Sequence, residues 1–342
     1  MVPVTILALE GALASSVTIT MDVLALANRT CLNAGRPPAF AVRLEGSGAH
    51  DFRPFLAFPE ADHRSPHQLI VPAQGFSKAA DYRQRLSEPD AVAGRELISE
   101  LIETGGLVAS SCTGTLLVAN SGALDGRRAT TAWWLAPIFQ EMFPAVVLDT
   151  AELVLTDGPC TTAGAAMAQM DLMVGLVAKH AGAKVAEFCA QTMVLDQRRS
   201  QTPYMAMGLL AASSESVSKA VAWARPRLGD GIGVNDLARH VGQSPRTFSR
   251  KVAAATGLSP VHFLQRLRVE RAVELIESTP LPFEEIAYRV GYSDPSTLRT
   301  LIRRGAGVGP RDLRARARKT IGREVPPPPV PAVPTRRGKA QA

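Results

Sequence analysis

Cys112 lies in a segment whose residue types could support covalent chemistry. The run Gly106–Leu117 is predicted to pass from a strand through a sharp turn into a helix, with the cysteine in the turn. Such a turn is typical of a nucleophile elbow, which exposes the thiol near a helix N-terminus and lowers its pKa. The alternative is a small buried hydrophobic residue without reactivity.

A cysteine nucleophile also needs a general base and a group that orients this base. The first half of the chain holds four histidines, which fall in predicted loops or at a helix end: His50, His63, His67 and His180. Their spacing recommends none of them as the base. We therefore expect no catalytic residues and no enzyme activity, with a Cys112-dependent hydrolase or amidotransferase as the alternative.

A second constellation is an internal repeat in the last third of the chain. Asp236–Ser244 aligns with Glu285–Ser293 at an offset of 49 residues, and after a one-residue insertion the offset becomes 50. The pairs that match at the new offset are Phe248 with Leu298, Val252 with Ile302, Gly257 with Gly307, Pro260 with Pro310 and Phe263 with Leu313. Each copy is predicted to form two short helices joined by a tight turn, which is the helix-turn-helix arrangement.

The turn and the second helix of each copy carry local signals. Gly242 and Gly291 stand where a tight turn between helices needs a residue without a Cβ. Ser244 and Ser293 are expected to be the N-caps of the second helices, and Pro245 suits the first helical position.

The second helices are predicted to have one apolar and one polar face. Phe248 and Val252 are four residues apart, as are Leu298 and Ile302, and each pair predicts a stripe that docks on the first helix. The opposite faces present Arg246, Ser249 and Arg250 in the first copy and Ser296, Thr297, Arg299, Thr300 and Arg303 in the second. Arginine pairs with guanine edges and Ser or Thr reaches several bases, so these faces suit a DNA major groove. For a lone helix, a solvated surface is the alternative.

A long helix is predicted between the two copies, over Val261–Ser278. Its length of roughly 30 Å is close to the ~34 Å of one DNA turn. The sequence therefore predicts that two reading helices contact two adjacent major grooves of double-stranded DNA.

The charge distribution fits a polyanion partner for this part of the chain. The net charge of +7 divides into −5 for residues 1–205, with 15 Lys+Arg and 20 Asp+Glu, and +12 for residues 206–342, with 23 and 11. Charge alone does not separate DNA from RNA or membrane lipid.

Residues 1–195 alternate strand-length apolar runs with helical patterns. The predicted strands are Val4–Leu9, Ala41–Leu44, Gln68–Val71, Gly106–Ser110, Val146–Leu148 and Leu153–Thr156, and the clearest helices are Met21–Asn28, Asp90–Thr104 and Thr115–Ser121. This alternation predicts an α/β fold with a doubly wound, mostly parallel sheet sandwiched by helices. An all-α double helix-turn-helix domain is expected to follow.

Composition suggests where the domains begin and end. With 342 residues we expect two domains, an α/β sensor and dimerisation domain over 1–195 and a DNA-binding domain over 214–320. Residues 196–213 are expected to be a linker, and the basic, proline-rich residues 321–342 a disordered tail.

Several features indicate the compartment. The N-terminus lacks a basic start, and no run reaches the roughly 18 apolar residues of a membrane helix. The four cysteines include no CxxC pair. We expect a cytoplasmic protein without membrane contact, metal site or cofactor.

The C-terminal third, from about Ser216 to Lys319, resembles the AraC/XylS-type DNA-binding domain. The resemblance rests on Ile286-Ala287, Gly291-Tyr292-Ser293-Asp294-Pro295-Ser296 and the later Gly307-x-Gly309-Pro310. The departures are Thr300 where an arginine is common, Ile302 where a large aromatic is usual, and Val308-Gly309-Pro310 in place of a Ser-Pro pair. The resemblance implies the fold and a DNA-binding role, and the departures concern individual base contacts.

Residues 2–195 resemble the class I glutamine amidotransferase-like, PfpI-like domain around Cys112, Leu124–Thr131 and Thr161–Gly164. Joined to an AraC-type domain, this makes the chain similar to the GlxA-type transcriptional regulators. Catalytic members often follow the cysteine with histidine, whereas this chain has Thr113.

Two more positions depart from this family's pattern. Regulators of this type often read Thr-Thr-His-Trp, whereas this chain reads Thr130-Thr131-Ala132-Trp133. The early acidic residue of related enzymes falls near Ser16. The resemblance therefore implies a sensor rather than a catalyst.

A small-molecule pocket is expected at the strand ends, where doubly wound sheets bind ligands. The candidate pocket residues are Ser16, Asp22, Cys112, Thr113, Ala132 and Trp133, with ordinary core packing as the alternative for Trp133. The sequence thus predicts a transcription regulator that is controlled by an unidentified small-molecule effector, forms a homodimer through its N-terminal domain and contacts RNA polymerase. A ligand-independent DNA-binding protein is the alternative.

Overall fold

The computed structural model describes residues 1–62, 67–74, 79–196, 198, 200, 201, 204–211, 214–306 and 308–321. The predicted tail, from residue 322 onward, lies outside the described residues. Gly307 of the repeat and His63 also lie outside them.

Within the described residues, the first half of the chain is built on a six-stranded sheet in the order β2-β1-β3-β4-β8-β7. The strands are β1 (Val2–Leu7), β2 (Phe40–Glu45), β3 (Gln68–Val71), β4 (Leu107–Ser111), β7 (Val154–Asp157) and β8 (Cys160–Ala163). Neighbours run parallel except for β7 and β8. A short parallel pair, β5 (Arg128–Ala129) and β6 (Val147–Leu148), packs beside β7. The predicted α/β fold with a mostly parallel sheet is confirmed.

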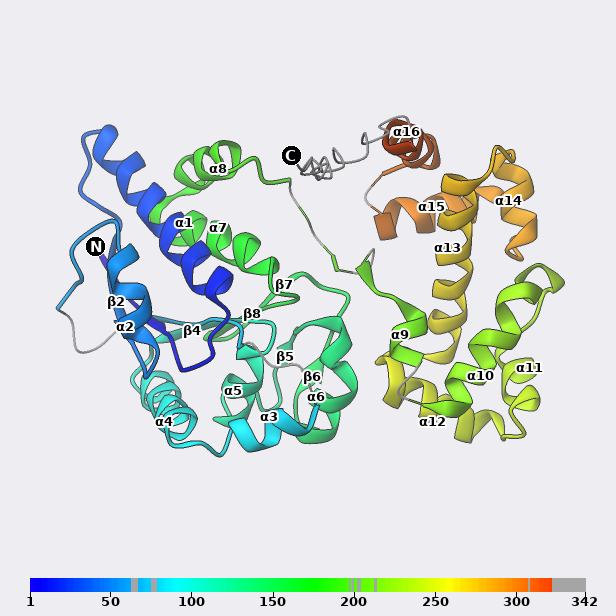
Figure 1. Ribbon diagram of the computed structural model, residues 1–342, viewed down its shortest axis with the longest axis horizontal. Coiled ribbons are helices and arrows are strands. Elements are labelled where there is room, and N and C mark those ends of the chain that lie inside the picture. The colour runs from blue at the N-terminus through cyan, green and yellow to red at the C-terminus, as the bar shows by residue number, and fades with distance from the viewer. Residues whose placement is uncertain are drawn as a thin grey trace, which may run out of the picture.

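Helices cover both faces of the sheet, which forms the middle of three layers (Figure 1). One face carries α1 (Ala14–Asn33), α7 (Ala168–Ala181) and α8 (Ala183–Thr192), and α2 (Ala49–Phe52) follows β2. The other face carries α3 (Ala79–Arg85), α4 (Pro89–Glu103), α5 (Gly114–Asn120) and α6 (Ala136–Met142). Because helices cover both faces, the interior strands β3 and β4 are buried along almost their whole length and do not alternate.

The described C-terminal part consists of helices. They are α9 (Met207–Ala211), α10 (Glu215–Ala224), α11 (Val234–His240), α12 (Pro245–Thr256), α13 (Pro260–Ser278), α14 (Phe283–Arg289), α15 (Pro295–Ala306) and α16 (Pro310–Ile321). One apolar core joins α9 to α12 with the first half of α13, and another joins the second half of α13 to α14, α15 and α16. In this part of the chain and in the sheet part alike, none of the described helices combines the length and apolar character of a membrane span.

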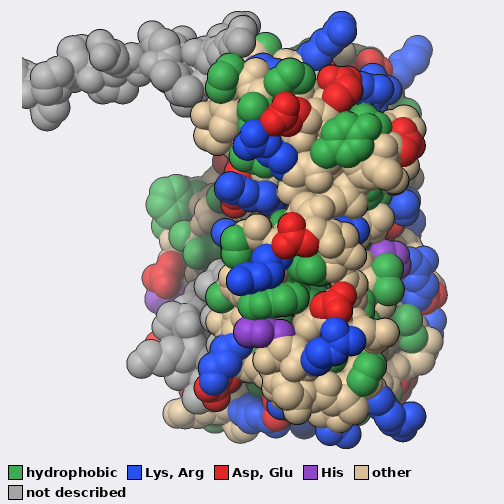
Figure 2. Space-filling view, turned by 90° about the vertical axis from the view of Figure 1, so that its right-hand side faces the viewer, with side chains coloured by type: hydrophobic (Ala, Val, Ile, Leu, Met, Phe, Trp, Pro, Cys, Tyr) green, Lys and Arg blue, Asp and Glu red, His purple; other side chains and the backbone are tan. Residues whose placement is uncertain are grey.

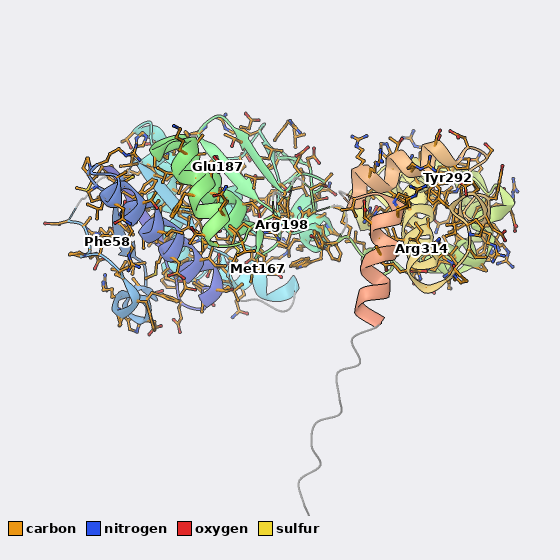
Figure 3. All side chains as sticks on the ribbon, turned by 90° about the horizontal axis from the view of Figure 1, so that it is seen from above. Phe58, Met167, Glu187, Arg198, Tyr292 and Arg314 are labelled. Atoms are coloured by element: carbon orange, nitrogen blue, oxygen red, sulfur yellow. The ribbon has the colours of Figure 1, made fainter. Side chains whose placement is uncertain are left out.

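The segment 196–213, which connects the sheet part to the helical part, makes polar contacts with both of them. Arg198 donates from Nη2 to the carbonyl of Met167 at 2.8 Å and pairs with Asp171 on α7 (Figure 3). The Met207 backbone N–H donates to Oε1 of Glu270 on α13 at 2.9 Å. The helix α9 therefore lies within the predicted linker 196–213, and its start is tied to the connecting helix.

Candidate DNA-reading helices and ligand pocket

Two helix-turn-helix units form where the repeat predicts them. The first unit is α11 and α12, the second is α14 and α15, and α13 connects the two. Phe248 and Val252 on α12 are fully buried, as are Leu298 and Ile302 on α15. The apolar stripes predicted for the second helices are therefore confirmed.

Both turns need glycine for its backbone conformation, and the second turn also needs it for space. Gly242 has φ 65° and Gly291 has φ 83°, the left-handed region that other residues rarely adopt. At Gly291 a Cβ would also come within 2.3 Å of the Leu228 carbonyl oxygen, whereas the space at Gly242 is open. The second turn is thus restricted by packing as well as by backbone conformation.

The two units differ in their N-caps. Ser244 caps α12, because its Oγ accepts the Thr247 N–H at 3.2 Å, and Pro245 takes the first helical position as predicted. The prediction of Ser293 as the second cap is wrong. Asp294 accepts the N–H groups of Ser296 and Thr297 at 2.9 and 3.2 Å. The hydrogen bond from the Ser296 hydroxyl, followed by those from the Ser296 N–H and from Thr297, lowers the pKa of Asp294 to about 2. The one-residue insertion in the repeat falls before the cap, so Asp294 is the counterpart of Ser244.

The predicted reading residues of α12 lie on its outer side. Arg246 and Arg250 are exposed. Ser249 is half-buried, and its Oγ donates to the Pro245 carbonyl at 2.6 Å. The side chains of Arg246 and Arg250 therefore reach farthest from this helix toward a partner.

The predicted reading residues of α15 are all exposed: Ser296, Thr297, Arg299, Thr300 and Arg303. Their hydroxyls have local partners. Ser296 and Thr297 donate to Asp294, and Thr300 donates to the Ser296 carbonyl at 3.0 Å. Arg299 lies over the Phe283 ring, 5.0 Å from its centroid, with its Nη2 3.8 Å from Glu284. Within the part of the chain that the structure describes, Arg303 makes no ring contact or ion pair like those of Arg299 with α14.

The reading helices lie on the side of the helical part that is turned toward the sheet. Figure 1 shows α12 and α15 on this side and α11 and α14 on the far side. The helix α12 packs against α6, and a Cβ at Gly257 would lie 3.5 Å from the Ala136 Cβ. The far face mixes Lys and Arg with acidic and apolar side chains (Figure 2). A duplex that reaches α12 must therefore approach beside the sheet part.

Cys112 adopts the strained backbone of an elbow, but its thiol is buried. Its φ is 50°, and its N–H donates to the Ala163 and Gly164 carbonyls at 3.0 and 2.8 Å. The residue is 5% exposed, and burial raises the pKa of the thiol to about 11. The structure therefore supports the alternative of a buried residue over an exposed thiol with a lowered pKa, because burial raises the pKa and the hydrogen bonds to Thr113 and Ala166 do not outweigh it.

Ser16 and Thr113 are buried and hold neighbouring strand ends together. Ser16 Oγ accepts the Ala73 N–H at 3.0 Å and lies 3.4 Å from Ser111 Oγ. Thr113 Oγ1 donates to the Gln74 carbonyl at 2.7 Å and accepts the Gln74 N–H at 2.6 Å. The cavity beside Thr113 measures only about 20 Å³, which is room for one water molecule.

The other predicted pocket residues separate into two groups. Ala132 and Trp133 are buried, and the carbonyl of Cys112 accepts a hydrogen bond from the neighbouring Thr131 at 2.7 Å. Trp133 belongs to the apolar core of the helical part. Asp22 is exposed on α1, two turns beyond Ser16, and is not buried with the rest.

Gln201 is a site residue that the sequence did not suggest. It is 1% exposed, and its side chain reaches from the connecting segment to Thr130, Thr131 and the backbone of Trp133. Its sequence surroundings, polar residues next to a proline, read as linker. Only the fold shows that this amide is buried at the strand ends.

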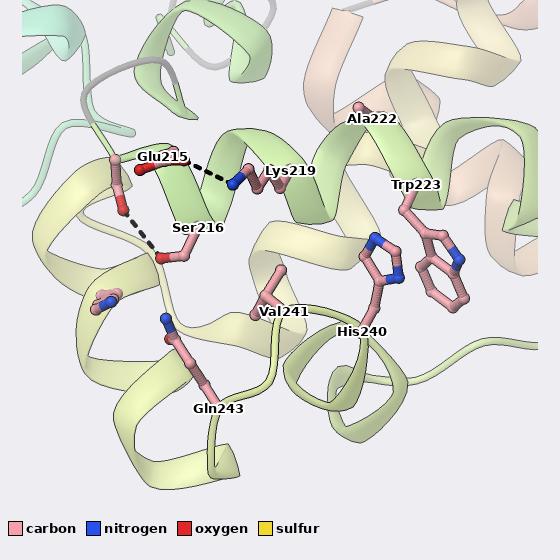
Figure 4. Close-up of a pocket in the computed structure, with 10 residues that line it drawn as sticks. Glu215, Ser216, Lys219, Ala222, Trp223, His240, Val241 and Gln243 are labelled. Carbon is pink, nitrogen blue, oxygen red and sulfur yellow. Dashed lines mark hydrogen bonds and ion pairs between the residues drawn. The ribbon is translucent and has the colours of Figure 1, made fainter.

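Larger cavities lie elsewhere. One of about 280 Å³ opens at the edge strand β2 and is lined by Met21, Asn28, Phe40, Leu56 and Phe58 among others. A depression of about 740 Å³ lies between α10 and α11, where Trp223 stacks on His240 with ring centroids 4.8 Å apart (Figure 4). Neither cavity is lined by the six predicted pocket residues. Within the described ranges, His, Cys, Asp and Glu side chains form no group of three or more that could hold a metal.

Residues 237–316 match the family model of a helix-turn-helix domain. These residues therefore belong to a helix-turn-helix domain. The matched range begins in α11 and ends in α16, so it contains both turns and the connecting helix.

Curated relatives extend the similarity beyond this domain. The chain is 26% identical to the HTH-type transcriptional regulator GbdR of Pseudomonas aeruginosa over 206 residues, which is 59% of this chain and 56% of that regulator. It therefore spans little more than half the length of this relative. It is 28% identical to the HTH-type transcriptional regulator GlxA of Rhizobium meliloti over 271 residues, 75% of this chain and 78% of GlxA. Among solved structures, an AraC family transcriptional regulator from Pseudomonas putida covers 56% of this chain and 100% of its own length, with 18% identity and a TM-score of 0.44.

Proposed function

We propose that this protein is a sequence-specific DNA-binding transcription regulator whose activity is controlled by a small metabolite. The observation that carries the proposal is the pair of helix-turn-helix units with buried apolar stripes and exposed arginines. The 19-residue helix α13 joins them, and its length of about 29 Å matches one turn of DNA. The similarity to GbdR and GlxA, both transcriptional regulators, supports it.

In this proposal residues 214–320 bind two adjacent major grooves and residues 1–195 are the sensor. Residues 196–213 connect the two parts. The sensor also forms the homodimer, the exposed helical surfaces contact RNA polymerase, and the protein works in the cytoplasm.

We further propose that the sensor is not a catalyst. With a pKa of about 11 the Cys112 thiol is protonated at neutral pH. His67 and His180 lie against each other, ring centroids 5.9 Å apart, and His67 directly precedes β3 at the end of the sheet opposite to the elbow. His50 is largely exposed and pairs with Asp51. None of these three described histidines is placed to act as a base for Cys112.

The test is a salt titration of duplex DNA binding by the full chain. Each phosphate contact releases counterions, so the logarithm of the binding constant should fall linearly with the logarithm of salt concentration, with a slope of several units. As a control, Arg227→Glu changes an arginine between α10 and α11, outside both reading helices, and should leave the sequence preference unchanged. Failure to bind DNA at low salt, or binding indifferent to salt, would refute the proposal.

A further inference from the structure

The side chain of Gln201 fills a buried slot whose polar groups match the two ends of a carboxamide. Its Nε2 lies 2.7 Å from the Thr131 carbonyl, 3.2 Å from Thr130 Oγ1 and 3.3 Å from the Glu152 carbonyl. Its Oε1 accepts the Trp133 backbone N–H at 3.3 Å. Three acceptors thus surround the amino end and one donor faces the carbonyl end.

The floor of the slot selects a flat group. A Cβ on Gly164 would come within 2.7 Å of Cδ, Nε2 and Oε1 of Gln201 alike. The amide plane therefore lies flat over the Gly164 Cα, where a larger residue leaves no room. A carboxylate in the same place would turn an oxygen toward the Thr131 and Glu152 carbonyl oxygens, which have no proton to share, and this is costly in a buried site.

The slot borders the elbow at the carboxyl ends of β4 and β8. The Gly164 carbonyl accepts the Cys112 N–H at 2.8 Å, and Thr131 Oγ1 donates to the Cys112 carbonyl at 2.7 Å. Parallel sheets of this kind bind ligands at this edge. The amide of Gln201 therefore lies at this edge of the sheet, next to the elbow, and is 1% exposed.

We propose that this slot is an effector subsite for small primary carboxamides and that Gln201 is its built-in occupant. The proposal rests on the proposed function of the chain as an effector-controlled regulator. A carboxamide that replaces the Gln201 side chain detaches the start of the connecting segment. Downstream, Met205 and Met207 pack with Trp133 and Phe248 in one apolar core, so detachment loosens the contact between the sheet part and α12.

The experiment uses the full chain and three variants, with propionamide as the probe. Gln201→Ala empties the slot, Gly164→Ala obstructs it, and Gln191→Ala changes an exposed glutamine on α8 as the matched control. Calorimetry or ligand-observed NMR should show that Gln201→Ala binds propionamide at least tenfold more tightly than the unmodified chain. It should prefer propionamide at least tenfold over propionate and N,N-dimethylpropionamide. Gly164→Ala should bind no propionamide. Gln191→Ala should bind propionamide as tightly as the unmodified chain does.

Amide hydrogen exchange at Trp133 supplies a readout that needs no DNA. The Trp133 N–H loses its acceptor in Gln201→Ala, so its exchange should speed up and slow again when propionamide is added. An emptied slot that binds the three probes equally, binding that survives Gly164→Ala, or unchanged Trp133 exchange would overturn the proposal.

DNA affinity of the unmodified chain, measured without any probe, separates this inference from the proposed function. Loss of carboxamide selectivity with salt-dependent DNA binding intact refutes only the carboxamide subsite. Selective carboxamide binding by a chain that does not bind DNA refutes only the regulator.

Discussion

The two helix-turn-helix units share one sequence plan but have different surroundings. In the first unit Phe248 and Val252 belong to a core that also contains Trp133 from the sheet part and Met207 from the connecting segment. In the second unit Leu298 and Ile302 pack in a core drawn from residues 269–313. The repeat therefore builds one unit that packs against the sheet part and one that packs against the connecting helix and its own neighbours.

The exposed arginines of the two reading helices also have different surroundings. Arg246 and Arg250 project from a helix that also packs against α6 of the sheet part, whereas Arg299 is held over Phe283 within its own unit. If residues 1–195 act as the proposed sensor, we expect their signal to reach DNA through the first unit, with the second unit as the fixed one.

Core truncations should give the largest effects and break the symmetry of the two units. Phe248→Ala and Leu298→Ala each remove a fully buried side chain and should destabilise the protein by about 3–5 and 2–5 kcal/mol respectively. Only Phe248→Ala should also accelerate amide exchange at Trp133. Denaturant unfolding with residue-resolved exchange measures both, and equal acceleration by the two variants would contradict the coupling of the first unit alone.

Arginine substitutions should separate the two halves of the DNA site. Arg246→Ala or Arg250→Ala should cost about 1–3 kcal/mol at a guanine contact and relax sequence preference in one half. Arg299→Ala should act on the other half, with a smaller loss because its guanidinium already contacts Phe283 and Glu284. Affinities for duplexes substituted base by base test this, and overlapping effects of all three variants would exclude a two-groove complex.

The caps offer a smaller contrast, this time in pH dependence. Ser244→Ala should destabilise the first unit by about 1 kcal/mol at any pH, since a hydroxyl cap does not titrate. Asp294 has a folded pKa of about 2, below the ordinary ~3.9. Its contribution is therefore complete above pH 4 and is lost as the pH falls through 2. NMR of the α15 amides should follow this midpoint, and a midpoint near 4 would show that the carboxylate does not cap the helix.

Cys112→Ser should have the smallest effect. The thiol is buried and protonated, so DNA binding and reporter output should stay close to those of the unmodified protein. Turnover of amides or aldehydes by the purified protein, abolished together with regulation by this substitution, would show that the sensor is an enzyme.

The parts of the fold that depend on local sequence patterns were predicted correctly. The repeat located both turns, both buried stripes and the connecting helix, and the apolar run Gln68–Val71 is β3 without correction. The interior strand β8 was not predicted because Cys160–Ala163 contains two threonines and an alanine and is not a run of large apolar residues. Its place in the sheet depends on pairing with two strands. The strand β4 is far away in the sequence, and β7 is joined to β8 by a turn.

Site chemistry was harder to predict because it depends on burial. The turn at Cys112 was evident, but whether it exposes or buries the thiol depends on how neighbouring strand ends close over it. Gln201 lies about 70 residues from Thr131 along the chain, and its role depends on the connecting segment folding back onto the strand ends. The cap at Asp294 was misassigned by one residue because the alignment insertion falls at the cap.

A footprint of the full chain on a duplex selected from random sequence tests the central claim most directly. The account predicts protection of two major-groove segments about one helical turn, roughly 34 Å, apart on one face of the duplex. It also predicts that Arg250→Ala weakens one segment and Arg303→Ala the other. Protection of a single groove segment, or a uniform footprint without a selected sequence, would contradict the account.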